Sequence, residues 1–220
     1  MLAETGQFAL ILAFVVALLQ GVVPLAGTLN RDRQAMTFAS TASLIQFACI
    51  AYAYAVLTHA FITSDFSLSV VAANSHTLKP MLYKVSGVWG NHEGSMLLWV
   101  LILAVFGASV ALGKAQLQAT LRANTLAVQG LISAGFLAFI LFTSNPFERL
   151  PFVPVEGNGL NPILQDPGLA FHPPFLYLGY VGFSIAFSFS VAALIEGKID
   201  ASWARCVRPW VLAAWCFLTI

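Results

Sequence analysis

The stretch QFALILAFVVALLQGVVPLAGTL, residues 7–29, contains no Asp, Glu, Lys or Arg. At 1.5 Å per residue, a helix of this length crosses the roughly 30 Å apolar core of a bilayer. The residues before it include Glu4 and no basic residue, whereas a cleavable signal peptide has a basic start and a shorter apolar core. The stretch therefore predicts a retained membrane-spanning helix.

The composition of the whole chain agrees with a membrane protein. Of 220 residues, 59% are hydrophobic and 9% are charged, which is too little polar surface to cover a soluble globule of this size. The net charge is +1 and no basic face is visible, so we expect no nucleic-acid partner. The three cysteines, Cys49, Cys206 and Cys216, form no CxxC motif and predict neither a disulfide framework nor a thiol redox pair.

Four further apolar segments are each long enough to span a bilayer: residues 37–63, 95–111, 125–143 and 174–195. A sixth begins at Pro209 and reaches the last residue, Ile220, after only about 18 Å of helix. We therefore expect an all-α polytopic membrane protein with five complete transmembrane helices and the start of a sixth. Residues 1–220 form a single transmembrane domain in this interpretation, and the short sixth segment suggests a truncated sequence or one piece of a split protein.

The basic residues between the spans predict the orientation. Seven fall in the first, third and fifth connections and three in the second and fourth, which places the N-terminus and two long loops on the outer side. The five spans lack Asp, Glu, Lys and Arg, which argues against proton or ion pumping. The first group is Arg31, Arg33, Lys114, Arg122, Lys198, Arg205 and Arg208, and the second is Lys79, Lys84 and Arg149.

The two outer loops differ in character. In SHTLKPMLYKVSGVWG, residues 75–90, apolar residues recur at helical intervals, so a short interfacial helix that starts or breaks at Pro80 is expected. Residues 144–173 hold six of the ten prolines, which favours an extended, stiff path instead of a helix. Such a loop is suited to mounting one ligand.

His172 lies in NPILQDPGLAFHPPFLYLGY, residues 161–180, where the second loop meets the fifth span. Pro173 should hold His172 in an extended backbone, Pro174 suits the first turn of a helix, and residues 166–168 are typical of a turn. A neutral imidazole in this place can ligate iron or act as a pH-tunable acid or base. The alternative is an interfacial histidine that caps the helix.

Tyr177 and Tyr180 follow His172 near the outer mouth of the same span. They could line a flat macrocycle, or they could belong to an aromatic belt and ordinary packing. His92, in VWGNHEGSMLLW (residues 88–99), could ligate a metal or grip a carboxylate. The alternative is that His92 belongs to a tight turn with a structural role.

Around His92, Asn91 is a suitable N-cap, and Glu93 would lie in the first helical turn. We expect structural or solvated roles for His59 and His76. No HExxH, GxSxG or glycine-rich phosphate loop is present, so hydrolase and nucleotide-binding functions have no support.

Three strings resemble one family: VWGNHEGSMLLWVLIL (residues 88–103), FILFTSNPF (139–147) and LNPILQDPGLAFHPPFLYLGYVGFS (160–184). They are similar to the N-terminal third of the CcmF family of cytochrome c-type biogenesis proteins, which handle haem in membranes. The similarity runs along essentially the whole chain. The resemblance implies a multi-pass protein of the bacterial inner membrane, or of the mitochondrial inner membrane in an organelle, with a periplasmic N-terminus.

The resemblance also implies a function. A haem lyase of this family takes haem from the chaperone CcmE at the outer face and joins its vinyl groups to the CxxCH thiols of an apocytochrome c, which a CcmH-type protein presents. The incoming b-type haem is its substrate, and His172 would be an axial ligand of the haem iron. Tyr177, Tyr180 and His92 are further candidates for contact with the haem.

Several parts of the family pattern are absent from residues 1–220. The tryptophan-rich segment would follow Ile220, and a second outer-loop histidine and two intramembrane histidines for a second haem are also missing. The chain alone is therefore expected to be inactive as a synthase and to need the remaining part of CcmF as a partner. A non-catalytic assembly scaffold and a haem exporter stay open as alternatives.

Overall fold

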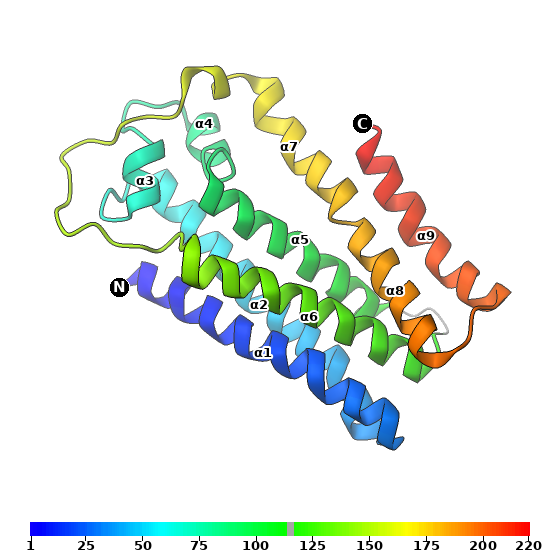
Figure 1. Cartoon of the computed structure of the whole chain (residues 1–220). Helices are drawn as coiled ribbons and strands as arrows, with labels where there is room; N and C mark the ends of the chain where they lie inside the picture. Colours follow the sequence, from blue (N-terminus) through cyan, green and yellow to red (C-terminus); the bar gives the residue numbers. More distant parts are fainter. Residues whose placement is uncertain (114–116) are drawn as a thin grey trace.

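The computed structural model describes residues 1–113 and 117–220 and consists of helices and connecting loops (Figure 1). Within these residues the only β pairing is an isolated antiparallel bridge between Leu68 and Arg149. Five segments are long and apolar enough to span a membrane, which confirms the predicted number. They are α1 (Leu2–Asn30), α2 (Arg33–Thr63), α5 (His92–Leu112), α6 (Ala119–Thr143) and Pro167–Glu196, which contains α7 (Pro167–Tyr180) and α8 (Phe183–Glu196).

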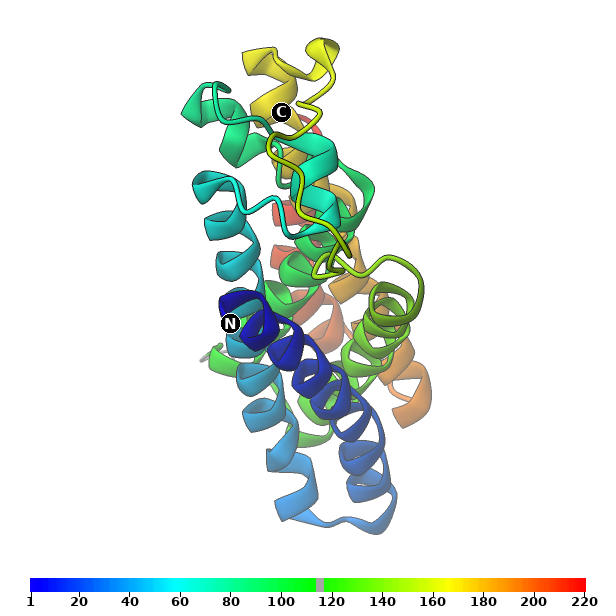
Figure 2. The same cartoon turned by 90° about the vertical axis from the view of Figure 1, so that its left-hand side faces the viewer.

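The spans form a single bundle. The α1–α2 hairpin packs against α5 and α6, α8 packs on α6, and α9 (Ala201–Leu218) packs on α7 and α8. The N-terminus, the long loops and the start of α7 gather at one end of the bundle, which we call the outer end (Figures 1 and 2). The α1–α2 and α8–α9 connections lie at the opposite, inner end. Lys114, used in the orientation prediction, lies outside the described residues.

Side-chain caps mark where α2 and α5 begin. The Asp32 carboxylate accepts the Gln34 N–H at 2.8 Å and starts α2. Asn91 accepts the Gly94 N–H at 2.8 Å and starts α5, with Glu93 in its first turn, as the sequence predicted. These bonds satisfy donors that the first turn of any helix leaves without an internal partner.

The fifth span begins earlier than predicted, and it is broken. Asp166 accepts the N–H groups of Gly168 and Leu169, so α7 starts at Pro167 instead of Pro174. The expected turn at residues 166–168 is therefore a helix cap. The helix stops again before Gly182, where an added Cβ would lie 2.4 Å from the carbonyl oxygen of Leu178.

The sixth helix also begins earlier than predicted. It starts after the N-cap Asp200, and Pro209, the expected first residue, lies inside it. An apolar run predicts only the part of a helix that lies in the bilayer core. The turns that carry Arg205 and Arg208 lie nearer the interface, so they are helical but not apolar. The same reason explains why α6 begins at Ala119, six residues before the apolar run that predicts it.

The two outer loops pack against each other. The expected short helix is present as α4 (Met81–Ser86), directly after Pro80, and α3 (Ser69–Asn74) precedes it. The second loop is non-helical to residue 161, as predicted, and then forms a 3-10 turn (Pro162–Leu164). Backbone bonds join the loops: Ser69 N–H to Glu148 O at 2.9 Å, Leu150 N–H to Ser67 O at 3.0 Å and Asn158 N–H to Ala72 O at 2.8 Å.

Candidate functional site

His172 lies in the second turn of α7 at the outer end, with an exposed side chain. Its backbone is helical, so the predicted extended conformation is wrong. The pre-proline preference is a bias that a helix capped from Asp166 overrides. No hydrogen bond or ion pair to the described part of the chain engages the ring, which leaves an accessible imidazole on a short, capped helix.

A tryptophan supports this helix where its prolines weaken it. Pro174 has no N–H, so the carbonyl of Ala170, four residues earlier, loses its helical donor. The Trp89 indole N–H donates to that carbonyl at 3.0 Å, and Ala170 is buried. The sequence indicated the need for this bond, because a proline inside a helix leaves the carbonyl four residues earlier without a backbone donor. Sequence reasoning missed its partner.

A cavity of about 310 Å³ opens beside α7, which we call the outer cavity. It brings together two predicted site residues, His92 and Tyr177, with Trp89. His172 is one position before the lining residue Pro173, about 100° around the helix, and is not part of the lining. The other lining residues are Ser86, Gly90, Asn91, Ser95, Leu160, Leu164 and Leu169.

The two tyrosines lie below His172 and pack on α5. Their ring centroids are 5.3 Å apart in an edge-on arrangement. The Trp99 ring lies 6.2 Å from that of Tyr177 and 4.9 Å from that of Tyr180. Only Tyr177 reaches the outer cavity, while Tyr180 is not among its lining residues.

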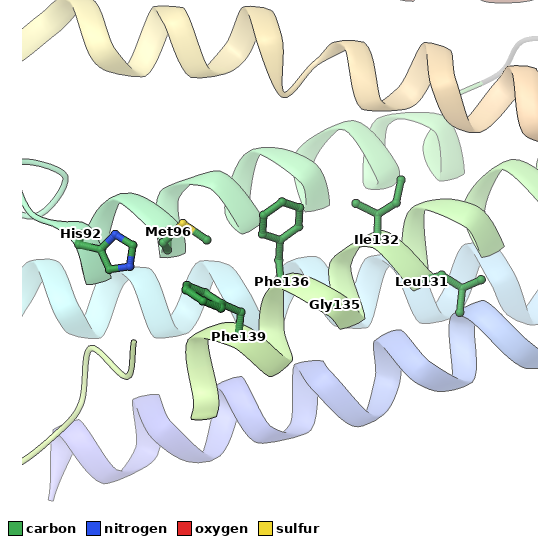
Figure 3. Close-up of a pocket in the computed structure, with 7 residues that line it drawn as sticks. All are labelled: His92, Met96, Leu131, Ile132, Gly135, Phe136 and Phe139. Carbon is green, nitrogen blue, oxygen red and sulfur yellow. The ribbon is translucent and has the colours of Figure 1, made fainter. Parts of the chain in front are cut away.

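His92 ties the start of α5 to the end of α6. Its Nε2 lies 3.0 Å from Ser144 Oγ, and its ring meets Phe139 edge-on at 6.0 Å. It also stands at one end of an apolar pocket of about 540 Å³ between these helices (Figure 3). The remaining residues of this pocket are Met96, Leu131, Ile132, Gly135, Phe136 and Phe139.

The other two histidines lie apart from this site. His59 is exposed on α2. His76 Nδ1 is 3.9 Å from a Glu156 oxygen, and the Thr77 hydroxyl and N–H donate to the same carboxylate. These bonds from Thr77, more than the charge of His76, hold the pKa of Glu156 below its usual value.

Two lysines of the first outer loop, one on α4 and one just before it, are buried. Lys79 Nζ donates to Asn74 O at 2.8 Å, and Lys84 Nζ donates to Ser64 Oγ at 2.9 Å. Burial, and secondly the charge of Lys84, lower the pKa of Lys79 to about 8. The loop-to-loop packing that buries them has no signature in local sequence.

No cluster of three or more His, Cys, Asp or Glu side chains suited to a metal ion occurs in the described residues. The site therefore offers one accessible imidazole, with an aromatic-lined cavity beside it. A single neutral imidazole is sufficient as one axial ligand of a haem iron, because the macrocycle supplies the four equatorial nitrogens.

Comparison with known proteins gives consistent matches. The family model for the cytochrome C assembly protein matches residues 89–220. The whole chain is 66% identical to cytochrome c-type biogenesis protein ccl1 of Rhodobacter capsulatus and covers 34% of it. It is 49% identical to cytochrome c-type biogenesis protein CcmF of Escherichia coli, again over 34% of that protein. The chain thus spans about a third of the length of these relatives.

The fold also matches a solved structure. Cytochrome c haem lyase CcmF superimposes on the whole chain with a TM-score of 0.87 and 28% sequence identity, over 34% of the solved chain.

Proposed function

The chain belongs to the cytochrome C assembly protein family, and on that basis we propose that it acts in cytochrome c maturation as the His172-bearing part of a membrane haem lyase. Haem would be its substrate. The chaperone CcmE would deliver the haem, and a CcmH-type protein would present the apocytochrome c, both at the outer face. The chain would lie in the bacterial inner membrane with its N-terminus in the periplasm.

The observation that carries this proposal is the accessible imidazole of His172 at the outer end of α7. An iron ligand must present a nitrogen that no protein group already occupies, and His172 satisfies this condition among the described residues. His92 fits the role less well, because its Nε2 is engaged with Ser144 Oγ. Tyr177 would contribute an aromatic surface at the outer cavity.

The contribution of the chain would be to position its substrate. With the iron bound to His172, the haem would be held at the outer face with its vinyl groups open to incoming thiols. Each thiol adds across a vinyl double bond: sulfur bonds one carbon and the proton goes to the other, with no oxidant or leaving group. Holding both reactants in place raises the rate through proximity, while the haem itself supplies the reactivity.

His172→Ala tests the proposal in an intact maturation system. We expect covalently bound haem in mature cytochrome c to fall to a few per cent or less, because the haem loses the ligand that orients it. His76→Ala is the matched control, since it removes another outer-loop histidine and should leave maturation near the original level. Normal maturation in His172→Ala would contradict the ligand role and favour the scaffold alternative.

A further inference from the structure

A cavity of about 470 Å³ lies at the inner end, between the start of α2, the end of α5 and the start of α6. These helix ends lie at the opposite end of the bundle from the start of α7, the helix that contains His172 (Figure 1). Polar and basic side chains line part of it, and apolar ones line the rest. The residues that matter here are Arg33, Met36, Ser40, Ala111, Ala119 and Arg122.

Two guanidinium groups from different helices converge on this cavity. Arg33 is exposed and forms no ion pair with any acidic residue in the described ranges. Arg122 Nη2 donates to Gly113 O at 3.4 Å, and its side chain lines the cavity opposite Arg33. Paired guanidinium forks match the oxygens of a phosphate.

The start of α6 adds to the positive potential. Gln118, its N-cap residue, makes no side-chain capping bond, so its side chain does not occupy the first N–H groups of the helix. Ala119, the first helical residue, lines the cavity. A helix N-terminus next to two guanidiniums favours an anion.

The lining also discriminates between kinds of headgroup. The described residues that line it include no carboxylate, so the amine of a zwitterionic headgroup would find no counter-ion among them. The acidic residue nearest in sequence, Asp32, accepts bonds from Gln34 and Ala35 as the α2 cap. A net-negative headgroup fits these charges better than a zwitterionic one.

The position in the membrane identifies the source of the phosphate. The cavity lies where apolar spans end and basic residues begin, the depth of lipid headgroups, and Met36 and Ala111 offer apolar contact toward the bilayer core. We infer that this cavity is a binding site for the phosphate of an anionic phospholipid of the inner leaflet, held between Arg33 and Arg122. Basic pockets between transmembrane helices bind such headgroups.

Lipid binding to the full chain in detergent micelles tests this inference, with native mass spectrometry as the readout. We expect phosphatidylglycerol to be retained more strongly than phosphatidylcholine. The double variant Arg33→Gln/Arg122→Gln should lower phosphatidylglycerol affinity about 30-fold, at roughly 1 kcal/mol for each arginine. Equal retention of the two lipids would overturn the inference.

Two controls distinguish a specific binding site from a general effect of positive surface charge on lipid retention. Arg31→Gln/Arg208→Gln removes the same charge from the same end, but neither residue lines the cavity, so the affinity should change less than about 3-fold. Ser40→Leu fills the cavity while it keeps both arginines, and it should also weaken retention. An equal loss in the Arg31/Arg208 variant, or full retention in Ser40→Leu, would contradict the site. So would displacement of the lipid by inorganic phosphate at equal concentration, because free phosphate would then be the ligand.

Discussion

The Trp89 indole N–H donates to the Ala170 carbonyl at 3.0 Å, the one carbonyl of α7 that Pro174 deprives of its helical donor. This bond connects the end of the first outer loop to the helix that carries His172. It replaces one of the donors that the two internal prolines of α7 remove, in the turn next to the exposed His172.

Trp89→Phe should lower the free energy of unfolding by about 1 to 3 kcal/mol, because a buried carbonyl loses its only described donor. Hydrogen exchange should quicken in residues 168–172. Pro174→Ala restores a backbone N–H that can bond Ala170 O, so Trp89→Phe should cost less in that background. Equal costs in the two backgrounds would show that the indole does not replace the missing donor.

Gly179 sets how closely α7 approaches α9. A Cβ at this position would lie 2.7 Å from the Leu218 nitrogen and 2.8 Å from its Cα, and backbone atoms cannot move aside cheaply. Gly179→Ala should therefore lower the free energy of unfolding by about 1 to 3 kcal/mol, as measured by denaturation in detergent.

Gly135→Ala in α6 is the matched control, since no atom lies within 4 Å of its added Cβ. Alanine favours helix over glycine by up to about 1 kcal/mol, so this variant should be neutral or slightly more stable. If both substitutions have the same effect, close packing of α7 on α9 does not explain the glycine at position 179.

Lys79 should make stability depend on pH. Its pKa in the folded chain is about 8, below the ordinary value of 10.5, so between these pH values the folded state binds fewer protons than the unfolded state. The free energy of unfolding therefore rises with pH across this window. Lys79→Met should remove that rise, measured as the melting temperature from pH 7.5 to 10.

The exposed Lys198 provides the comparison for this experiment. Lys198→Met should keep the rise of stability with pH, because it leaves the buried ammonium in place. A pH profile of Lys79→Met that runs parallel to that of the unsubstituted chain would show that Lys79 is not the group responsible.

The sequence was sufficient to predict the membrane spans, because the length of an uncharged apolar run is a local property. All five predicted spans are present, and Asn91 caps α5 as expected. Helix starts were less predictable. At α6 and α9 the first turns carry polar residues outside the apolar run, so hydropathy alone places the start too late.

The surroundings of the candidate site could be predicted only in part. The exposed position of His172 at the outer end follows from the loop order, but its helical backbone does not, because Asp166 and Trp89 together outweigh the local effect of Pro173. The burial of Lys79 depends on contacts between residues far apart in sequence. Such contacts leave no periodic pattern.

The most direct measurement is the absorption spectrum of the haem bound by a His172→Cys variant, compared with His76→Cys. If His172 ligates the iron, cysteine at position 172 replaces an imidazole with a thiolate or leaves the position open, and the Soret band shifts. The His76→Cys spectrum should match that of the unsubstituted protein. An unchanged Soret band and unchanged haem content in His172→Cys would contradict the account.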